Sequence, residues 1–241
     1  MKVAAYQAPV ASCYSPDAIL HIREQVRHCE ARGVELLCCP EGALGGLADY
    51  VDDPNEIAID VGAGELEPTL ASFASDSVTT VVGFTECDGS GRLFNSALVL
   101  YRGQVVGIYR KRHPAIHSSK YTAGTDAPVF TIGACTFGIL ICRDSQDDAL
   151  AASLVANGAT ALLIPTNNAM PRSRGGPELV RAARELDVRR AAELGVAVVR
   201  ADVVGEKDQL VSSGASSIVD RTGTIRAVAR AGQPGLVVAA V

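Results

Sequence analysis

The sequence predicts an α/β fold, with a sheet core and helices on its outer faces. Short apolar and β-branched segments alternate with helical segments along most of the 241 residues. Turn residues separate neighbouring strands, as at Asp88-Gly89-Ser90-Gly91 and Arg221-Thr222-Gly223. No repeat, low-complexity tract or linker interrupts this order. We therefore expect a single domain over residues 1–241, large enough to bury a core without a disulfide or a metal.

The N-terminal half is predicted to alternate between strands and helices. The first helix has Ser15 as its expected N-cap, Pro16 at its first position and Gly33 just past its end. Pro40 stops the second strand, and a loop rich in Gly and Asp follows it. Helices are expected over 17–32 and 65–75. Strands are expected over 3–8, 35–39, 79–85, 96–101 and 104–109.

The C-terminal half continues this alternation after an irregular stretch over 110–127. Gly133-Ala134 predicts a turn that pairs two strands as a hairpin. Helices are expected over 149–155 and 177–194. The expected strands of this half cover 129–132, 136–141, 160–164, 196–201, 216–220, 224–229 and 236–240.

Composition and charge exclude several classes of function. A net charge of −5 without a basic stripe argues against a nucleic-acid partner. No run of about 18 apolar residues exists, so we expect no membrane span. The start Met1–Gln7 turns polar too soon for a signal peptide. Seven cysteines without a CxxC pair therefore indicate reduced thiols in a cytoplasmic protein, and no zinc ribbon.

The junction at Cys142 is the most informative feature of the chain. Cys142 closes the apolar run Thr136–Ile141 and stands immediately before a polar segment that leads into a predicted helix. Backbone N–H groups at a helix start favour an anion. We therefore expect a thiol with a lowered pKa, at a place that can also hold an oxyanion.

Glu41 and Lys111 also come just after predicted strands. Binding sites in open α/β sheets form in the loops beyond strand ends, so these two side chains can converge with Cys142. Residue types alone leave other interpretations open. A glutamate after a strand is often a surface residue, a lysine in a basic segment is usually solvated, and a lone cysteine often packs in the core.

Three motifs around these residues resemble those of the nitrilase, or carbon–nitrogen hydrolase, superfamily. They are Pro40-Glu41-Gly42, Tyr109-Arg110-Lys111-Arg112-His113 and Ile141-Cys142-Arg143-Asp144, in the order and spacing of that family. Four more segments are similar to family motifs, so the resemblance covers essentially the whole chain. These segments are Tyr121–Gly124, Leu162–Asn167, Val188–Val196 and Ser213–Asp220.

The resemblance implies a four-layer α-β-β-α sandwich and a homodimer paired across an outer helical face. It also implies hydrolysis of a small amide or N-carbamoyl compound through a cysteine thioester. Cys142 would be the nucleophile, Lys111 would stabilise the oxyanion together with the backbone N–H of Arg143, and Glu41 would move protons. No metal or organic cofactor is required by this chemistry.

The chain also departs from the family pattern. His117 stands where many members carry a second glutamate, so it either substitutes as a hydrogen-bonding group or has a structural or solvent-facing role. His117 and His113 do not suggest a metal pair, because Pro114 lies between them. Cys142-Arg143-Asp144 replaces the Cys-Trp-Glu of nitrile-cleaving members, which favours amide or carbamoyl hydrolysis.

Several residues outside the three motif positions are candidates for substrate binding. The side chain of Arg143 can bind a substrate carboxylate or pair with an acid of the protein, and Arg172 or Arg174 can recognise a carboxylate. Tyr121 and Asn167 are further pocket candidates. Two alternatives to amide hydrolysis stay open at this point: a catalytically silent dimeric binding protein of the same fold, and nitrile hydrolysis.

Overall fold

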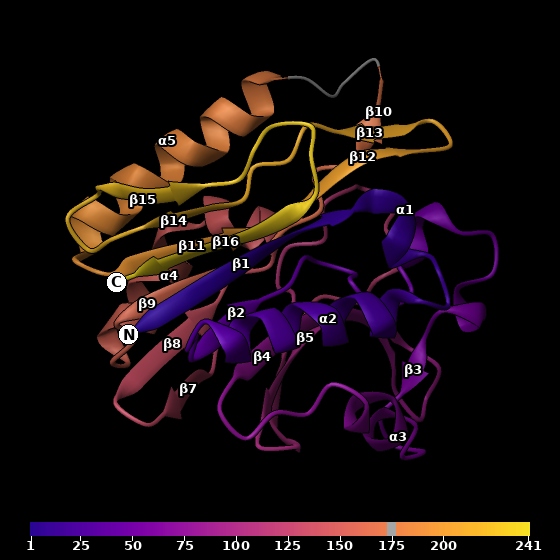
Figure 1. Cartoon of the computed structure of the whole chain (residues 1–241). Coiled ribbons are helices and arrows are strands. Elements are labelled where there is room, and N and C mark those ends of the chain that lie inside the picture. The colour runs from indigo at the N-terminus through magenta and orange to yellow at the C-terminus, as the bar shows by residue number, and fades with distance from the viewer. Residues whose placement is uncertain (173–176) are drawn as a thin grey trace.

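Two β-sheets stacked face to face form the centre of the molecule (Figure 1). The computed structural model describes residues 1–172 and 177–241. The first sheet has the order β10 (Met170–Pro171), β13 (Leu210–Ser212), β12 (Val203–Lys207), β1 (Lys2–Pro9), β2 (Leu36–Cys38), β4 (Thr79–Cys87), β5 (Leu93–Tyr101) and β6 (Gln104–Arg110). In addition, β16 (Gly235–Ala240) pairs with β1, and β3 (Ile59–Asp60) pairs with β4. The second sheet has the order β15 (Ile225–Val228), β14 (Ser217–Val219), β11 (Ala197–Ala201), β9 (Ala161–Pro165), β8 (Cys135–Ile139) and β7 (Val129–Ile132).

Helices cover the outer face of each sheet, so the predicted α-β-β-α sandwich is confirmed (Figure 1). The first sheet packs against α1 (Val10–Cys13), α2 (Ala18–Ala31) and α3 (Leu66–Ala71). The second packs against α4 (Asp148–Ala156) and α5 (Pro177–Leu194). Successive side chains of a strand point to opposite faces of its sheet. In β1, Val3 and Ala5 face the second sheet, whereas Ala4 and Tyr6 face the helices.

The start of α2 differs from the prediction. The helix begins at Ala18 rather than Asp17, and Ser15 is not its N-cap. The Ser15 hydroxyl instead accepts a hydrogen bond from the Asp17 backbone N–H at 3.1 Å, within a turn before the helix. The end was predicted correctly, because Gly33 has φ +63°, which suits the residue after a helix. No helix among the described residues is long and apolar enough to span a bilayer.

The hairpin of β12 and β13 was not among the predicted strands. Each of its strands has only two apolar side chains, Val203 and Val204 in β12 and Leu210 and Val211 in β13, which is a weak strand signal. Asp208 turns the chain with φ +53°, a conformation that Asp tolerates better than most residues. The helix predicted over 65–75 is also shorter, since α3 ends at Ala71.

Strand direction decides where the functional loops meet. Strands β1, β2 and β4 are parallel, as are β8, β9 and β11. Because β5 is antiparallel to both of its neighbours, β6 runs in the same direction as β4. The loops after β2 and β6 therefore leave the first sheet at one end, and the loops after β8 and β9 leave the second sheet at one end. The hydrogen bond from the Glu41 N–H to the Thr166 carbonyl oxygen shows that these ends lie together.

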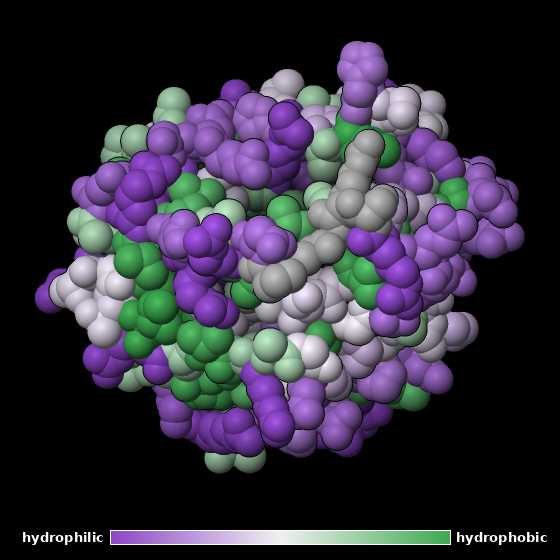
Figure 2. Space-filling view, turned by 90° about the horizontal axis from the view of Figure 1, so that it is seen from above, coloured by the Kyte–Doolittle hydropathy of each residue, from purple (hydrophilic) through white to green (hydrophobic). Residues whose placement is uncertain are grey.

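The face that carries α5 has a shallow apolar hollow of about 590 Å³ beside β15. Val180, Val188 and Ile225 line this hollow together with Arg181 and Arg184. Figure 2 looks onto this side of the molecule and shows apolar side chains gathered among polar ones. The homodimer stays a prediction, and this hollow lies on an outer helical face of the kind it requires.

Candidate active site

Glu41 lies in a tight turn directly after β2, buried with 2 % of its surface exposed. The turn presses against β4 so closely that a Cβ on Gly83 would lie 2.5 Å from the Pro40 carbonyl oxygen. Gly42 continues the turn with φ +61°. The backbone N–H of Glu41 donates to the Thr166 carbonyl oxygen at 3.3 Å, which ties this loop to the loop after β9.

Lys111 follows β6 and forms a buried ion pair with Glu41. Its Nζ lies 2.5 Å from Glu41 Oε1, and only 3 % of its side chain is exposed. Burial disfavours the ammonium, but the neighbouring acidic groups, with Glu41 foremost, together outweigh this, so the pKa of Lys111 is raised and the group stays charged. The backbone is fixed as well, because Gly124 N–H donates to the Lys111 carbonyl oxygen at 2.8 Å. A Cβ on Gly124 would lie 2.2 Å from the Arg110 carbonyl oxygen, so this approach requires glycine.

Two amides hold the Glu41 carboxylate from the other directions. Asn95 Nδ2 donates to Oε1 at 2.8 Å, and the backbone N–H of Asn167 donates to Oε2 at 2.9 Å. Asn167 was predicted to contact substrate, whereas the structure uses its backbone to orient Glu41. Asn95 was missed by the sequence analysis, although an amide inside the apolar strand β5 was a usable signal.

Cys142 is the first residue of a 3₁₀ turn, η3 (Cys142–Gln146), that follows β8. It has φ +47°, a strained conformation for a residue other than glycine. Buried Asp144 braces this turn: its Oδ2 accepts from the Ile141 N–H at 3.2 Å and from the Tyr109 hydroxyl at 2.7 Å. Its Oδ1 accepts from the His113 N–H at 2.8 Å, so the carboxylate ties the Cys142 turn to the segment that carries Lys111.

The prediction of a lowered thiol pKa is wrong. Burial, followed by the charge of Glu41, raises the pKa of Cys142 to about 12, while Lys111 and Arg200 act in the opposite direction. The helix-start effect is weak here, since η3 is a short 3₁₀ turn and α4 begins only at Asp148. The thiol is therefore protonated near neutral pH and has a carboxylate within electrostatic reach. The structure brings Glu41, Lys111 and Cys142 to the same end of the sandwich.

The other predicted binding residues do not join this cluster. The Tyr121 hydroxyl is buried, accepts a hydrogen bond from the Ala48 N–H at 2.6 Å and shares one with Thr85 Oγ1 at 2.7 Å. It therefore fixes the loop that contains Ala48. His117 is exposed and contacts neither Glu41 nor Lys111 within the described part of the chain. The Arg143 guanidinium is exposed and donates to the Ala115 carbonyl oxygen at 3.3 Å.

The predicted carboxylate-binding arginines lie elsewhere. Arg172 forms an exposed ion pair with Glu206 of β12. Arg174 lies outside the described residues. Tyr50, which the sequence analysis did not single out, lies near the reactive groups: burial, and then the charges of Glu41 and Asp49, raise its pKa. Tyr50 is about one third exposed, so its ring borders the site from the loop after Glu41.

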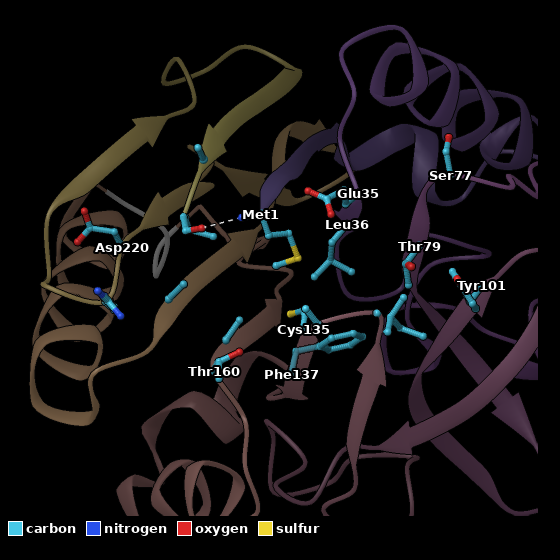
Figure 3. Close-up of a pocket in the computed structure, with 18 of the residues that line it drawn as sticks. Met1, Glu35, Leu36, Ser77, Thr79, Tyr101, Cys135, Phe137, Thr160 and Asp220 are labelled. Carbon is cyan, nitrogen blue, oxygen red and sulfur yellow. Dashed lines mark hydrogen bonds between the residues drawn. The ribbon is translucent and has the colours of Figure 1, made fainter.

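A cavity lies at the opposite end of the sandwich. It measures about 960 Å³, and Leu36, Cys135, Ala161 and Ala197, the first residues of β2, β8, β9 and β11, line it (Figure 3). Met1 also lines it, and the Met1 amino group donates to the Val241 carbonyl oxygen at 3.0 Å. The buried ion pair and the strained cysteine, rather than the cavity size, mark the reactive end. Among the described residues, no cluster of His, Cys, Asp and Glu suits a metal ion.

One family of known proteins matches the chain over nearly its whole length. The family described as carbon-nitrogen hydrolase matches residues 2–241. The chain belongs to this family. It is 32 % identical over 242 residues to a glutamine-dependent NAD(+) synthetase of Xylella fastidiosa, a match that covers 96 % of this chain and 42 % of that protein. It is 31 % identical over 197 residues to a nitrilase of Pyrococcus abyssi, covering 80 % of this chain and 71 % of that one.

Solved structures of this family share the fold. Glutamine-dependent NAD+ synthetase from Acinetobacter baumannii superposes with a TM-score of 0.82 at 21 % identity, covering 98 % of this chain and 44 % of that chain. An amidase from Nesterenkonia superposes with a TM-score of 0.81 at 21 % identity, covering 99 % and 89 %. The chain thus spans less than half the length of the synthetase relatives and most of the length of the amidase.

Proposed function

We propose that this carbon–nitrogen hydrolase cleaves a small amide or N-carbamoyl compound through a thioester on Cys142, releasing ammonia or an amine. The observation that carries the proposal is the buried ion pair of Glu41 and Lys111 beside the strained Cys142. An amide carbon is a poor electrophile, so its hydrolysis needs a nucleophile, charge stabilisation and a proton carrier. These three groups supply one of each.

In the first step, Cys142 Sγ attacks the carbonyl carbon and its proton passes to Glu41. The raised thiol pKa makes this transfer part of the reaction, because the sulfur keeps its proton until a substrate is attacked. The Lys111 ammonium and the backbone N–H of Arg143 stabilise the oxyanion. Loss of one such donor typically costs about 3–4 kcal/mol of transition-state stabilisation.

In the second step, Glu41 gives its proton to the departing nitrogen, and a thioester remains on Cys142. Glu41 then takes a proton from water, whose oxygen attacks the thioester carbonyl. Collapse of this intermediate releases the acid and returns a proton to the sulfur. Overall, one amide and one water become one carboxylic acid and one ammonia or amine. A carbamoyl compound gives a carbamic acid in place of the carboxylic acid.

Among the candidate substrates, we place the side-chain carboxamide of glutamine first. This choice is supported by relatives named as glutamine-dependent enzymes that match 96 % of this chain. Nitrile hydrolysis is a second candidate, supported by the relative named as a nitrilase. It ranks lower because Cys142 is followed by Arg143 rather than tryptophan.

The test is a panel of amides, carbamoyl compounds and nitriles, with ammonia release and intact-protein mass as readouts. We expect a covalent acyl adduct on Cys142, whose mass identifies the acyl group. Cys142→Ala should remain folded and form no adduct. Its turnover rate should be lower than that of the wild type by more than about 10³-fold. Turnover that persists in Cys142→Ala would overturn the proposal. A folded wild type that turns over no panel member and forms no adduct would favour a silent binding protein.

A further inference from the structure

Two buried arginines lie beneath the turn that carries Cys142. Arg190 of α5 and Arg200 of β11 are 1 % and 2 % exposed. Arg190 donates to the Ser145 carbonyl oxygen, and Arg200 Nη2 donates to Ser145 Oγ at 3.3 Å. Ser145 belongs to η3, so two guanidinium groups hold the turn from the side of the second sheet.

Arg200 is itself fixed by a carboxylate from α5. Its Nε and Nη2 donate to the two oxygens of Asp187, each at 2.7 Å, and Asp187 is fully buried. Such a two-point contact between a planar guanidinium and a carboxylate sets orientation as well as distance. The remaining terminal nitrogen, Nη1, donates to Thr166 Oγ1 at 2.9 Å.

Thr166 connects this guanidinium to the proton-carrying group. Its carbonyl oxygen accepts the Glu41 backbone N–H, and the next residue, Asn167, donates its own N–H to Glu41 Oε2. Arg200 therefore contacts the loop that supports Glu41 and the turn that presents Cys142. A single rigid group bridges the two loops.

Resting on the proposed function, we propose that the Arg200–Asp187 ion pair is a positioning device that sets the placement of Cys142 relative to Glu41. Arg200 is hydrogen-bonded to neither group in the described structure, so it positions them through Thr166 and Ser145, and its charge acts on the Cys142 thiol in addition. A strained backbone such as that of Cys142 persists only where its surroundings hold it. Proton transfer from sulfur to carboxylate also requires a defined separation, and a misplacement of about 1 Å can lower a rate about 100-fold.

The cost of burying this pair supports a role beyond stability. Replacing a buried ion pair by apolar residues of similar size is often neutral or stabilising for a fold. Arg200 interrupts the otherwise apolar strand β11, and Asp187 is fully buried on α5. Apolar residues at both positions would complete the packing between helix and sheet without this buried ion pair.

The test uses the double variant Asp187→Leu with Arg200→Met, which removes both members of the ion pair together. We expect thermal unfolding close to that of the wild type, a kcat for the best panel amide lower by about 10- to 100-fold, and little change in KM. Arg189→Met is the matched control, since Arg189 lies on the same helix but pairs at the surface with Asp148 and Glu193. It should keep the wild-type kcat. A folded double variant with the wild-type kcat would overturn the proposal.

A second variant separates charge from geometry. Arg200→Lys keeps a positive charge but cannot contact Asp187 at two points and also reach both Thr166 and Ser145. We expect its kcat to fall nearly as far as in the double variant. Full activity in a folded Arg200→Lys would show that the charge alone suffices, and would overturn the positioning role.

A measurement without amide turnover keeps this inference separate from the proposed function. The effect of Glu41→Gln on the rate at which methyl methanethiosulfonate modifies Cys142 reports the coupling between the two groups. This coupling should be lost in the Asp187→Leu, Arg200→Met background. An equal coupling in both backgrounds would overturn the positioning role, whether or not the wild type hydrolyses any amide. If no panel compound is hydrolysed but the coupling between Glu41 and Cys142 is lost in the double variant, only the proposed function is overturned.

Discussion

Strand β8 has a cysteine near each of its ends, and the two thiols lie in very different surroundings. Cys135 begins the strand and lines the large cavity, and Cys142 comes three residues after its last residue. Both are partly exposed, and burial raises the pKa of both thiols. Exposure and burial therefore do not distinguish a reactive position from an inert one in this fold.

The difference lies in the charges and in the backbone. Cys142 is influenced by Glu41, Lys111 and Arg200, and its φ is +47°. The thiol pKa of Cys135 is affected, after burial, by a hydrogen bond involving Thr160, and then by the N-terminal amino group and the exposed Glu35, which are not a buried ion pair. Functional sites concentrate buried paired charges and strained backbone. Of the two ends of β8, only the Cys142 end has both features among the described residues.

Removal of the proton carrier should have the largest effect. Glu41→Gln keeps the size of the side chain but cannot take the thiol proton, so we expect ammonia release to fall by about 10²- to 10⁴-fold. The measurement is kcat/KM for the best panel substrate, with circular dichroism as a check of folding. This result would place the chemistry at the Cys142 end of the sandwich.

A matched control tests whether any buried glutamate would give the same loss. Glu86 is also 2 % exposed and pairs with a cation, Arg110, and with the Ser96 hydroxyl. Glu86→Gln should reduce stability and lose far less activity than Glu41→Gln. Equal losses in the two variants would show that the effect comes from general destabilisation, and the proton-carrying role of Glu41 would then be wrong.

The fold, and the meeting of Glu41, Lys111 and Cys142 at one end of the sandwich, were predictable from the sequence for a physical reason. Strand periodicity and turn residues are local signals, and the loops after parallel strands converge at one sheet edge whatever the loop conformations are. Glu41, Lys111 and Cys142 each follow a strand, so their meeting depends on topology alone. The family resemblance then supplied the pairing of these residues with a hydrolytic reaction.

The supporting residues were harder to predict, because their roles depend on contacts between distant segments. Asn167 contacts Glu41 through its backbone N–H, which no residue-type pattern records. Tyr121 points its hydroxyl at a backbone N–H 73 residues earlier in the chain. The thiol pKa of Cys142 was predicted in the wrong direction because burial and the Glu41 charge outweigh the short helical turn. Arg200 did leave a signal, since it is a charge inside an apolar strand.

The raised thiol pKa leads to a smaller but distinctive effect. A thiol with a pKa of about 12 is mostly protonated at pH 7 and loses its proton only as the pH rises. Modification of Cys142 by methyl methanethiosulfonate should therefore accelerate by about tenfold per pH unit between about pH 7 and 10. The rate is followed by peptide mass at Cys142. A plateau below about pH 8.5, the usual thiol pKa, would show a thiolate in the resting protein and would contradict the proton transfer proposed above.

The smallest effect is expected at the other end of β8. Six residues lie between Cys135 and Cys142, and an extended chain of this length spans roughly 20 Å, so a change at Cys135 cannot reach the ion pair through direct contact. Cys135→Ser keeps the side-chain volume, and the new hydroxyl can hydrogen-bond with Thr160, which already interacts with the thiol. We expect kcat/KM within about twofold of the wild type, as for a change away from the site. A tenfold loss in a folded Cys135→Ser would mean that the large cavity communicates with the reactive end, and the division of the sandwich into a chemical end and an inert end would be wrong.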